Sequence, residues 1–296
     1  MDIDTPILPV QQVDDRIWLK RDDLYAPFDD CGLNGAKVYQ CMSLLAGSKE
    51  RIFNDYDGTV FTDTSLKSPQ GSIVARVARE FGMKSILCVG TKDAQYAIDN
   101  YPAVRFAHRM GATIERVCGP GASMSLDVFA KRMHEGKHFH VAFGMNAVDA
   151  KTRDLVLGPV SLQAKAFHDL PTEDMTLVVP GGSCVAFSGL LLGLSREKIK
   201  FKRILSVQIA GYNRSARINA MTNAGPSWSS GSNPLPEYEH IADKTYPYAK
   251  EVRRSVGSVE LDRGYEAKAW AWVERELPPS EKVLFYVVGN SNSVRE

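Results

Sequence analysis

The chain has 296 residues, of which 44% are hydrophobic and 24% charged, so it is long enough to form one large globular domain or two modest ones. Its 36 basic and 35 acidic residues leave a net charge of +1 and form no long run of either sign, which argues against an electrostatic surface for nucleic acid or membrane. No stretch approaches the roughly 20 apolar residues of a membrane span, and the acidic start at residues 1–4 is unlike a signal peptide, so we expect a cytoplasmic protein.

The first predicted helix begins near Ala36 and carries a lysine, Lys37, in its first turn. The apolar residues that repeat at helical spacing after it are Val38, Cys41, Met42 and Leu45. The positive end of the helix dipole and the apolar face beside Lys37 both lower the pKa of its amine. A neutral amine is a nucleophile that can form a Schiff base with a carbonyl cofactor, usually pyridoxal phosphate (PLP). The alternative is that Lys37 only extends from the helix start to water.

Short strands then alternate with helices, which predicts parallel sheets. In the first block we expect strands at 59–62, 85–90, 113–118 and 138–143 and helices at 72–81, 101–110 and 123–134. In the second block we expect helices at 156–167, 185–195 and 265–276 and strands at 176–179, 204–209 and 282–288. The polar segment 223–236, rich in Gly, Ser and Pro, is predicted to be a long loop.

Neither a disulfide framework nor a metal site is expected. The five cysteines are scattered, odd in number and contain no Cys-x-x-Cys pair. His134, His138 and His140 cluster, and the last two share one face of a predicted strand, but no cysteine or carboxylate follows at the spacing of a metal ligand.

Three segments near the N-terminus carry a resemblance to known enzymes. Residues 5–8 (Thr-Pro-Ile-Leu), 17–24 (Ile-Trp-Leu-Lys-Arg-Asp-Asp-Leu) and 34–37 (Asn-Gly-Ala-Lys) resemble the opening of the fold-type II, or tryptophan synthase β-like, PLP-dependent enzymes. The most similar branch is that of 1-aminocyclopropane-1-carboxylate (ACC) deaminase and D-cysteine desulfhydrase. The resemblance implies that Lys37 is the lysine that binds the PLP cofactor. Ala36 stands where those enzymes carry an asparagine.

A polar loop follows the strand at 59–62, at the end of a parallel strand where ligands bind in such sheets. In the enzymes that the chain resembles, this loop reads Gln-Ser-Asn-His, with the Ser near the substrate and the Asn bonded to the phenolic oxygen of PLP. Here residues 67–70 read Lys-Ser-Pro-Gln. The resemblance therefore implies a catalytic role for Ser68 and a cofactor-binding role for Gln70, one residue beyond the Asn position. The alternative is a serine and a proline that only open a helix.

The segment 178–190 joins a buried strand to a helix through two glycines. Backbone amides and the helix dipole there face one point, which suits a phosphate group, although a tight turn without a ligand has the same pattern. The segment resembles the phosphate loop of the same enzymes, Gly-Ser-Gly-Gly-Thr-x-Ala-Gly-Leu. The cofactor-binding positions that this implies are Gly182, Ser183, Cys184, Val185 and Ala186. Because Cys184, Val185 and Ala186 depart from the family loop, binding would depend on backbone amides and on Ser183.

Residues 261–268 resemble the Leu-Asp-Pro-Val-Tyr-x-x-Lys segment of the deaminase and desulfhydrase branch, whose tyrosine points into the active site. The resemblance implies that Tyr265 is catalytic, since a phenol at a helix start can exchange a proton with a substrate. The alternative is a half-buried tyrosine that packs beside Trp270.

The end of the chain departs from the family. Those enzymes finish a strand with a Ser, Thr or Glu that faces the pyridine nitrogen of PLP, whereas Val287 or Val288 occupies that position here. Asn290 or Ser291 would have to reach the nitrogen, and we take Asn290 as the cofactor-binding candidate. Electron withdrawal by the ring depends on such a partner, so the departure bears on catalytic power.

The resemblance covers nearly the whole chain and implies the two-domain α/β fold of the fold-type II enzymes, with open parallel sheets flanked by helices. It places the cofactor between a large PLP-binding domain (1–47 and 147–296) and a small α/β domain (48–146). It also implies a homodimer that acts on a small-molecule amino acid.

The implied function is that of a PLP-dependent lyase or deaminase that works through a Schiff base on Lys37. The Lys37 amine would move a proton at the α or β carbon, Ser68 and the amides near Gln70 would receive the substrate carboxylate, and Tyr265 would assist departure of the leaving group. Elimination with release of ammonia is the expected outcome, and decarboxylation stays open. One alternative is a β-replacement synthase of the cysteine or threonine synthase type. The other is a specialised or non-catalytic descendant, including one that acts on an amino acid attached to a larger molecule.

Overall fold

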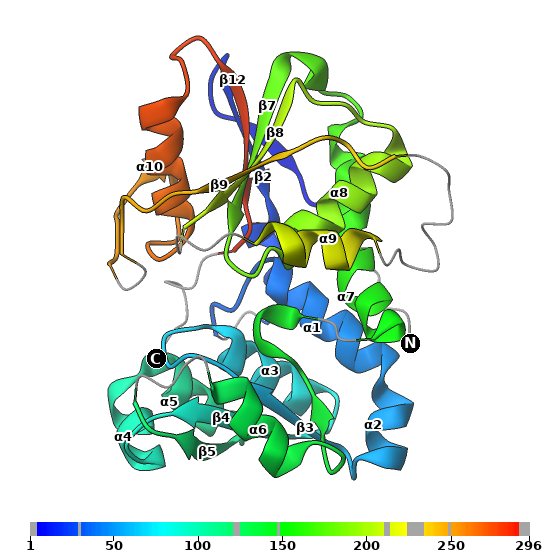
Figure 1. Cartoon of the computed structure of the whole chain (residues 1–296), viewed down its shortest axis with the longest axis vertical. Helices are drawn as coiled ribbons and strands as arrows, with labels where there is room; N and C mark the ends of the chain where they lie inside the picture. The colour runs from blue at the N-terminus through cyan, green and yellow to red at the C-terminus, as the bar shows by residue number, and fades with distance from the viewer. Residues whose placement is uncertain are drawn as a thin grey trace.

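The computed structural model describes residues 5–28, 31–120, 125–146, 149–209, 214–223, 234–247 and 250–289. These residues form a mixed α/β fold with two sheets of mainly parallel strands, flanked by helices (Figure 1). The fold class predicted from the sequence is confirmed.

The larger sheet has six strands in the order β1-β2-β12-β7-β8-β9. Their bounds are Val10–Gln12 for β1, Ile17–Arg21 for β2, Lys282–Val287 for β12, Met175–Gly181 for β7, Arg203–Gln208 for β8 and Glu239–Ala242 for β9. β1 pairs antiparallel with β2, and the other neighbours are parallel. Strand β12 therefore brings the end of the described chain between β2 and β7, beside the first strands.

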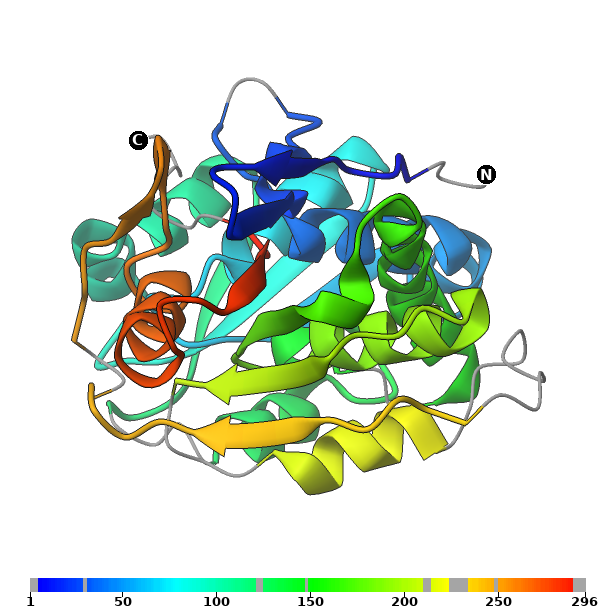
Figure 2. The ribbon, with the colours of Figure 1, turned by 90° about the horizontal axis from the view of Figure 1, so that it is seen from above.

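Helices cover both faces of this larger sheet. Leu177 and Val179 of β7 pack towards α8 (Val185–Glu197), whereas the intervening Val178 packs with Trp270 of α10 (Glu266–Glu276). This alternation follows the two-residue period of a strand. Figure 2 shows α10 on one side of the sheet and α8 on the other. Each fully buried Leu or Val contributes about 1.5–3 kcal/mol to folding.

The smaller sheet has four parallel strands in the order β5-β4-β3-β6. They span Thr113–Cys118 (β5), Lys84–Gly90 (β4), Thr59–Asp63 (β3) and Phe139–His140 (β6). All of these strands come from one continuous part of the chain. This supports the division into 1–47 with 147–296 and 48–146, which we propose as the domain organisation.

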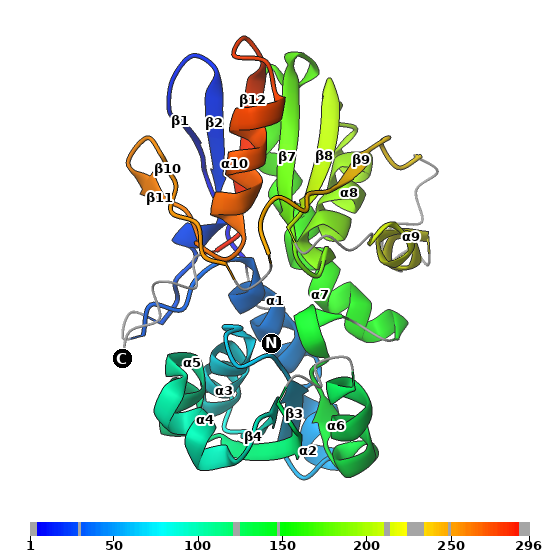
Figure 3. The same cartoon turned by 60° about the vertical axis from the view of Figure 1, so that its left-hand side comes forward.

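Helix α1 (Ala36–Gly47) lies between the two sheets together with α7 (Ala150–Leu162), as Figures 1 and 3 show. The apolar face predicted for α1 packs against α3 (Gln70–Glu80) of the smaller sheet and against α7 in one buried cluster. The helix that carries Lys37 is thus held from both sides.

The remaining helices are α2 (Lys49–Asp55), α4 (Ala94–Asn100), α5 (Pro102–Arg109), α6 (Leu126–His134) and α9 (Ser215–Asn223). Short 3-10 turns occupy Asp22–Leu24, Phe143–Met145, Gln163–Phe167 and Thr172–Asp174, and a small hairpin pairs β10 (Ser255–Val256) with β11 (Val259–Glu260). Among the described residues, no helix is long and apolar enough to cross a membrane.

Two predicted elements were wrong in extent. The strand expected at 138–143 is only Phe139–His140, because Gly144 takes a left-handed φ of 72° and the chain turns there. The helix expected at 156–167 begins at Ala150, where the Asp149 carboxylate caps it by accepting a hydrogen bond from the Thr152 amide at 2.9 Å, and it ends at Leu162. Most of the loop predicted at 223–236 lies outside the described residues.

Candidate active site

The first turn of α1 is fixed at the carboxyl end of β12. The Ala36 amide donates to the Val288 carbonyl oxygen at 2.7 Å, and Gly35 adopts a φ of 90° that favours glycine. A Cβ on Gly35 would lie 2.3 Å from that same oxygen, so no larger residue fits at the helix start. Lys37, one residue further on, is therefore held at the edge of the larger sheet.

The Lys37 amine has the environment of a nucleophile. Burial lowers its pKa, and the nearby charge of Asp262 opposes this only in part. Within the described part of the chain, no carboxylate lies within ion-pair distance of the amine and no hydrogen bond holds it. The neutral amine predicted for Lys37 is thus favoured by its surroundings.

Tyr265 lies immediately before α10 and faces the loop after β7. Its amide donates to the Asp262 carboxylate at 2.8 Å, and that carboxylate also accepts from the Gly264 amide at 2.9 Å, so the turn is rigidly held. A Cβ on Gly182 would lie 3.2 Å from Cε1 of the Tyr265 ring. The predicted catalytic tyrosine and the predicted phosphate loop are thus in contact.

Glu266 is a functional candidate that sequence reasoning missed. The residue is 1% exposed and its carboxylate accepts from the Gly289 amide at 2.9 Å and from the Asp262 amide at 3.1 Å. Burial, and then the charge of Asp262, raise its pKa well above the usual value. A buried acid thus lies beside Gly289, just after β12, in the region where the sequence offered two valines and then the candidate Asn290.

The loop from β7 into α8 combines glycine, a strained residue and free helix amides. Cys184 precedes α8 with a left-handed φ of 62°, which costs a non-glycine residue about 1–2 kcal/mol. Its thiol is 3.3 Å from Gln208 Oε1, and burial raises its pKa to about 11. Gly182, Ser183 and Ala186 are partly exposed, whereas Val185 is buried. Because the first amides of a helix have no partner within it, this loop can receive an anion.

Ser68 and Gln70 reach the same place from the smaller sheet. The Ser68 hydroxyl accepts from the Gln70 backbone amide at 3.3 Å, and the Gln70 side-chain oxygen Oε1 accepts from the Gly144 backbone amide at 2.6 Å. A Cβ on Gly144 would lie only 2.5 Å from the Ser183 Cβ. Gly144 therefore joins the predicted substrate loop to the predicted phosphate loop.

The Gln70 side chain is used differently from the role that the resemblance implies. Its amide nitrogen donates to the Thr62 hydroxyl at 2.9 Å and to the Ala142 carbonyl at 3.0 Å, so both N–H groups and the oxygen bind protein. The residue is fully buried. This arrangement supports a structural role for Gln70 and leaves little capacity for a cofactor oxygen. The other candidate, Asn290, lies outside the described residues.

A buried polar network supports the site from behind. Lys20 and Asp22 are both fully buried and pair at 2.5 Å, while the hydroxyls of Tyr39 in α1 and Tyr286 in β12 each donate to Asp22 Oδ2 at 2.6 Å. Gln163 Oε1 accepts from the Lys20 amine at 2.9 Å. The network ties the helix of Lys37 to two strands of the larger sheet.

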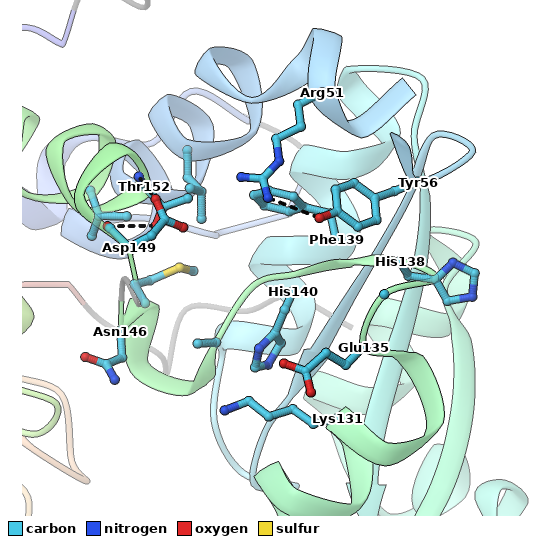
Figure 4. Close-up of a pocket in the computed structure, with 15 residues that line it drawn as sticks. Arg51, Tyr56, Lys131, Glu135, His138, Phe139, His140, Asn146, Asp149 and Thr152 are labelled. Atoms are coloured by element: carbon cyan, nitrogen blue, oxygen red, sulfur yellow. Dashed lines mark hydrogen bonds between the residues drawn. The ribbon is translucent and has the colours of Figure 1, made fainter. Parts of the chain in front are cut away.

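A cavity of about 220 Å³ opens elsewhere, beside α2, β6 and the start of α7 (Figure 4). The Arg51 guanidinium donates to the Tyr56 hydroxyl at 3.1 Å at its rim, and His140 and Lys131 point towards it. None of the predicted site residues lines this cavity, so we do not place the chemistry there.

The clustered histidines find partners far along the chain. His134 is 3.0 Å from Glu115 and His140 is 2.8 Å from Asp63, carboxylates that sequence spacing did not reveal. Asp63, Asp127 and His140 also place possible metal-ligand atoms within 4.8 Å of one another. Asp127 is also paired with Lys131 at 3.0 Å, which offsets the charge of that carboxylate.

No family model matches the chain. A curated relative, the O-seryl-dTMP PLP-dependent decarboxylase of Salmonella phage ViI, is 24% identical over 214 residues, which are 69% of this chain and 49% of that protein. The chain thus spans about half the length of the curated relative that it matches.

Solved structures of other proteins are similar to this chain over nearly its whole length. The match to an ACC deaminase homologue has a TM-score of 0.70 at 18% identity and covers 94% of this chain and 85% of the homologue's chain. The O-acetylserine-dependent cystathionine β-synthase of Helicobacter pylori has a TM-score of 0.60 at 14% identity, over 99% of this chain and 97% of its own. PLP, the cofactor expected from the sequence, is also the cofactor that the name of the phage enzyme states. The chain therefore has the fold of the fold-type II PLP-dependent enzymes.

Proposed function

We propose that this protein is a PLP-dependent enzyme that holds its cofactor on Lys37 and acts on an amino acid or an amino-acid-like group. The observation that carries the proposal is the Lys37 amine, which has a lowered pKa and no protein partner among the described residues. It lies at the edge of the larger sheet, within the electrostatic reach of Asp262.

The residues present fit this cofactor. Lys37 offers a neutral amine for its aldehyde, and the amides of the loop from Gly182 to Ala186 would receive its phosphate. Glu266 offers the buried acid that a pyridine nitrogen requires, in a region where the sequence had left Asn290 as the candidate. We therefore propose Glu266 as the partner of the ring nitrogen.

Bound PLP supplies an electron-withdrawing ring that stabilises the negative charge left when a bond at the substrate α-carbon is broken. The Lys37 amine would take or return a proton at the α or β carbon of a substrate. Ser68 would bind the substrate carboxylate, and the Tyr265 hydroxyl would donate a proton to the leaving group. With these roles we propose a lyase or deaminase that releases ammonia.

The test of this reaction is ammonia release by the PLP-loaded protein from a panel of small amino acids that includes ACC and D-cysteine. We expect release with at least one of them, and loss of release in Lys37→Ala. If the loaded protein binds the amino acids but forms product only when an acceptor nucleophile such as sulfide is added, it is a β-replacement synthase instead.

A second candidate is favoured by the phage relative, whose name states a decarboxylase of an O-seryl-dTMP group. Under this alternative, the substrate is an amino acid attached to a nucleotide and the reaction releases carbon dioxide. Incubation with O-seryl thymidine monophosphate, followed by mass spectrometry for the loss of carbon dioxide, distinguishes it from ammonia release.

We also propose a cytoplasmic homodimer, as the resemblance implies. Light scattering of the purified protein tests the assembly: a mass of about twice the 32.7 kDa chain supports it, and the mass of a single chain rejects it.

A further inference from the structure

An arginine from α9 binds the turn at residues 143–146, which packs against the loop that joins β7 to α8. Arg217 Nε lies 3.3 Å from Asn146 Oδ1, and its Nη2 lies 3.4 Å from the Phe143 carbonyl oxygen. Phe143 directly precedes Gly144, which is in close contact with Ser183 of the loop. The guanidinium therefore lies beside the junction of the two sheets, next to the predicted phosphate loop. Figure 1 shows α9 on the side of the larger sheet that faces the smaller one.

Among the residues that the structure describes, none is an anionic partner for Arg217. No carboxylate lies within ion-pair distance of it in the described ranges, and its two hydrogen bonds go to neutral oxygens. Burial, and then the charge of Arg214, lower its pKa. A partly buried cation is stabilised when an anion approaches it.

Both arginines lie within electrostatic reach of the loop. The charges of Arg214 and Arg217 act to lower the pKa of the Cys184 thiol, although burial outweighs them and raises it to about 11. Arg214 directly precedes α9 and Arg217 lies in its first turn, and the charges of the two arginines act on each other. Both positive charges therefore act on the residue that directly precedes α8.

The loop itself offers little to a phosphate besides its amides. Ser183 is its only hydroxyl between Gly181 and Phe187, because Cys184, Val185 and Ala186 carry none. Helix amides present only partial charges, equivalent to about half of an elementary charge. A dianion held there without a full cation nearby would keep an excess of negative charge.

We propose that Arg217 is a phosphate-binding residue of this site, which supplies a full positive charge to a phosphoryl group held by the loop between β7 and α8. Arg214 adds to the field of that cation. The assignment to the cofactor's phosphate rests on the proposed function, but a phosphoryl group on the substrate has the same chemistry.

The experiment measures dissociation constants of PLP and of pyridoxal, which lacks the phosphate, by absorbance titration of wild type, Arg217→Gln and Arg217→Lys. Thymidine monophosphate is titrated against the same variants by calorimetry. Arg203→Gln, which removes an exposed arginine paired with Glu239 at 3.0 Å, is the matched control for loss of one charge. Near-ultraviolet circular dichroism checks that each variant is folded.

We expect Arg217→Gln to weaken PLP binding about ten-fold or more and to leave pyridoxal binding unchanged, because a charge-assisted bond to phosphate is lost. Arg217→Lys should be intermediate, since it keeps the charge without the planar fork. If PLP binding is unchanged but thymidine monophosphate binding weakens by the same factor, the phosphoryl group belongs to the substrate.

Two results would overturn the proposal, and they differ from failure of the proposed function. Unchanged binding of both PLP and thymidine monophosphate in a folded Arg217→Gln protein rejects the role of Arg217. Equal weakening of PLP and pyridoxal also rejects it, because the effect would not involve the phosphate. If wild type instead binds no PLP at Lys37, while thymidine monophosphate still depends on Arg217, the proposed function fails and the phosphoryl site stands.

Discussion

Replacing Asp22 with asparagine should destabilise the protein strongly, because the variant keeps the shape of the side chain and removes its charge. Lys20 would then be a fully buried cation without an anion, and loss of one partner of a buried pair costs about 3–5 kcal/mol. Lys20→Met should cost less, about 1–3 kcal/mol, because Asp22 keeps the two phenol donors of Tyr39 and Tyr286 at 2.6 Å.

The assay is urea unfolding followed by far-ultraviolet circular dichroism, with all variants at one pH. The matched control is Asp57→Asn, which removes the partner of Lys84 from a highly exposed pair and should change stability by less than about 1 kcal/mol. The loss in Asp22→Asn should also shrink as the pH rises towards 10.5, the usual pKa of lysine, because the buried amine then sheds its proton. A loss in Asp22→Asn no larger than that in Asp57→Asn, or smaller than that in Lys20→Met, would refute this reasoning.

Three other variants probe the site. Because the raised pKa of Glu266 means that the folded protein binds its proton more tightly than the unfolded chain, wild type should lose stability as the pH rises above 4.5, its usual value. Glu266→Gln lacks this titration. Urea unfolding at about pH 5 and pH 8 should therefore show that the stability of the variant, relative to wild type, is higher at pH 8. A difference that is the same at both pH values contradicts the burial argument. Gly144→Ala places a methyl group 2.5 Å from the Ser183 Cβ at a φ of 72°, and should lower stability by about 1–3 kcal/mol in thermal unfolding. Tyr265→Phe should keep PLP affinity in absorbance titrations but lower the rate of product formation about 100-fold or more, and an unchanged rate would remove Tyr265 from proton transfer.

Much of the fold could be predicted because its signals are local. Short, continuous apolar runs identified β7 and β12, and the glycines at the end of β7 identified the turn into α8. The apolar stripe that follows Lys37 identified α1 as a helix buried on one face. These patterns depend on residues within one or two turns of each other, so no tertiary contact is needed to read them.

The rest of the site depends on contacts between distant segments. Glu266 has the sequence position of an ordinary acidic residue in the first turn of a helix, and only the approach of Gly289 and Asp262 shows that it is buried. Gln70 was assigned to the cofactor from its position in a loop that resembles the family loop. The sequence could not show that its side chain binds Ala142 and Gly144, which lie more than 70 residues away. Arg217 was not recognised, since nothing in its neighbourhood in the sequence marks α9 as lying beside the phosphate loop.

The most direct test of the central claim is the visible absorption spectrum of the purified protein with added PLP, compared with Lys37→Ala, before and after reduction with borohydride. We predict a band in wild type that is absent from the variant, and after reduction a cofactor fixed to the peptide that contains Lys37, as detected by mass spectrometry. Absence of the band from both proteins, or fixation at another lysine, would contradict the assignment of Lys37 as the cofactor-binding residue.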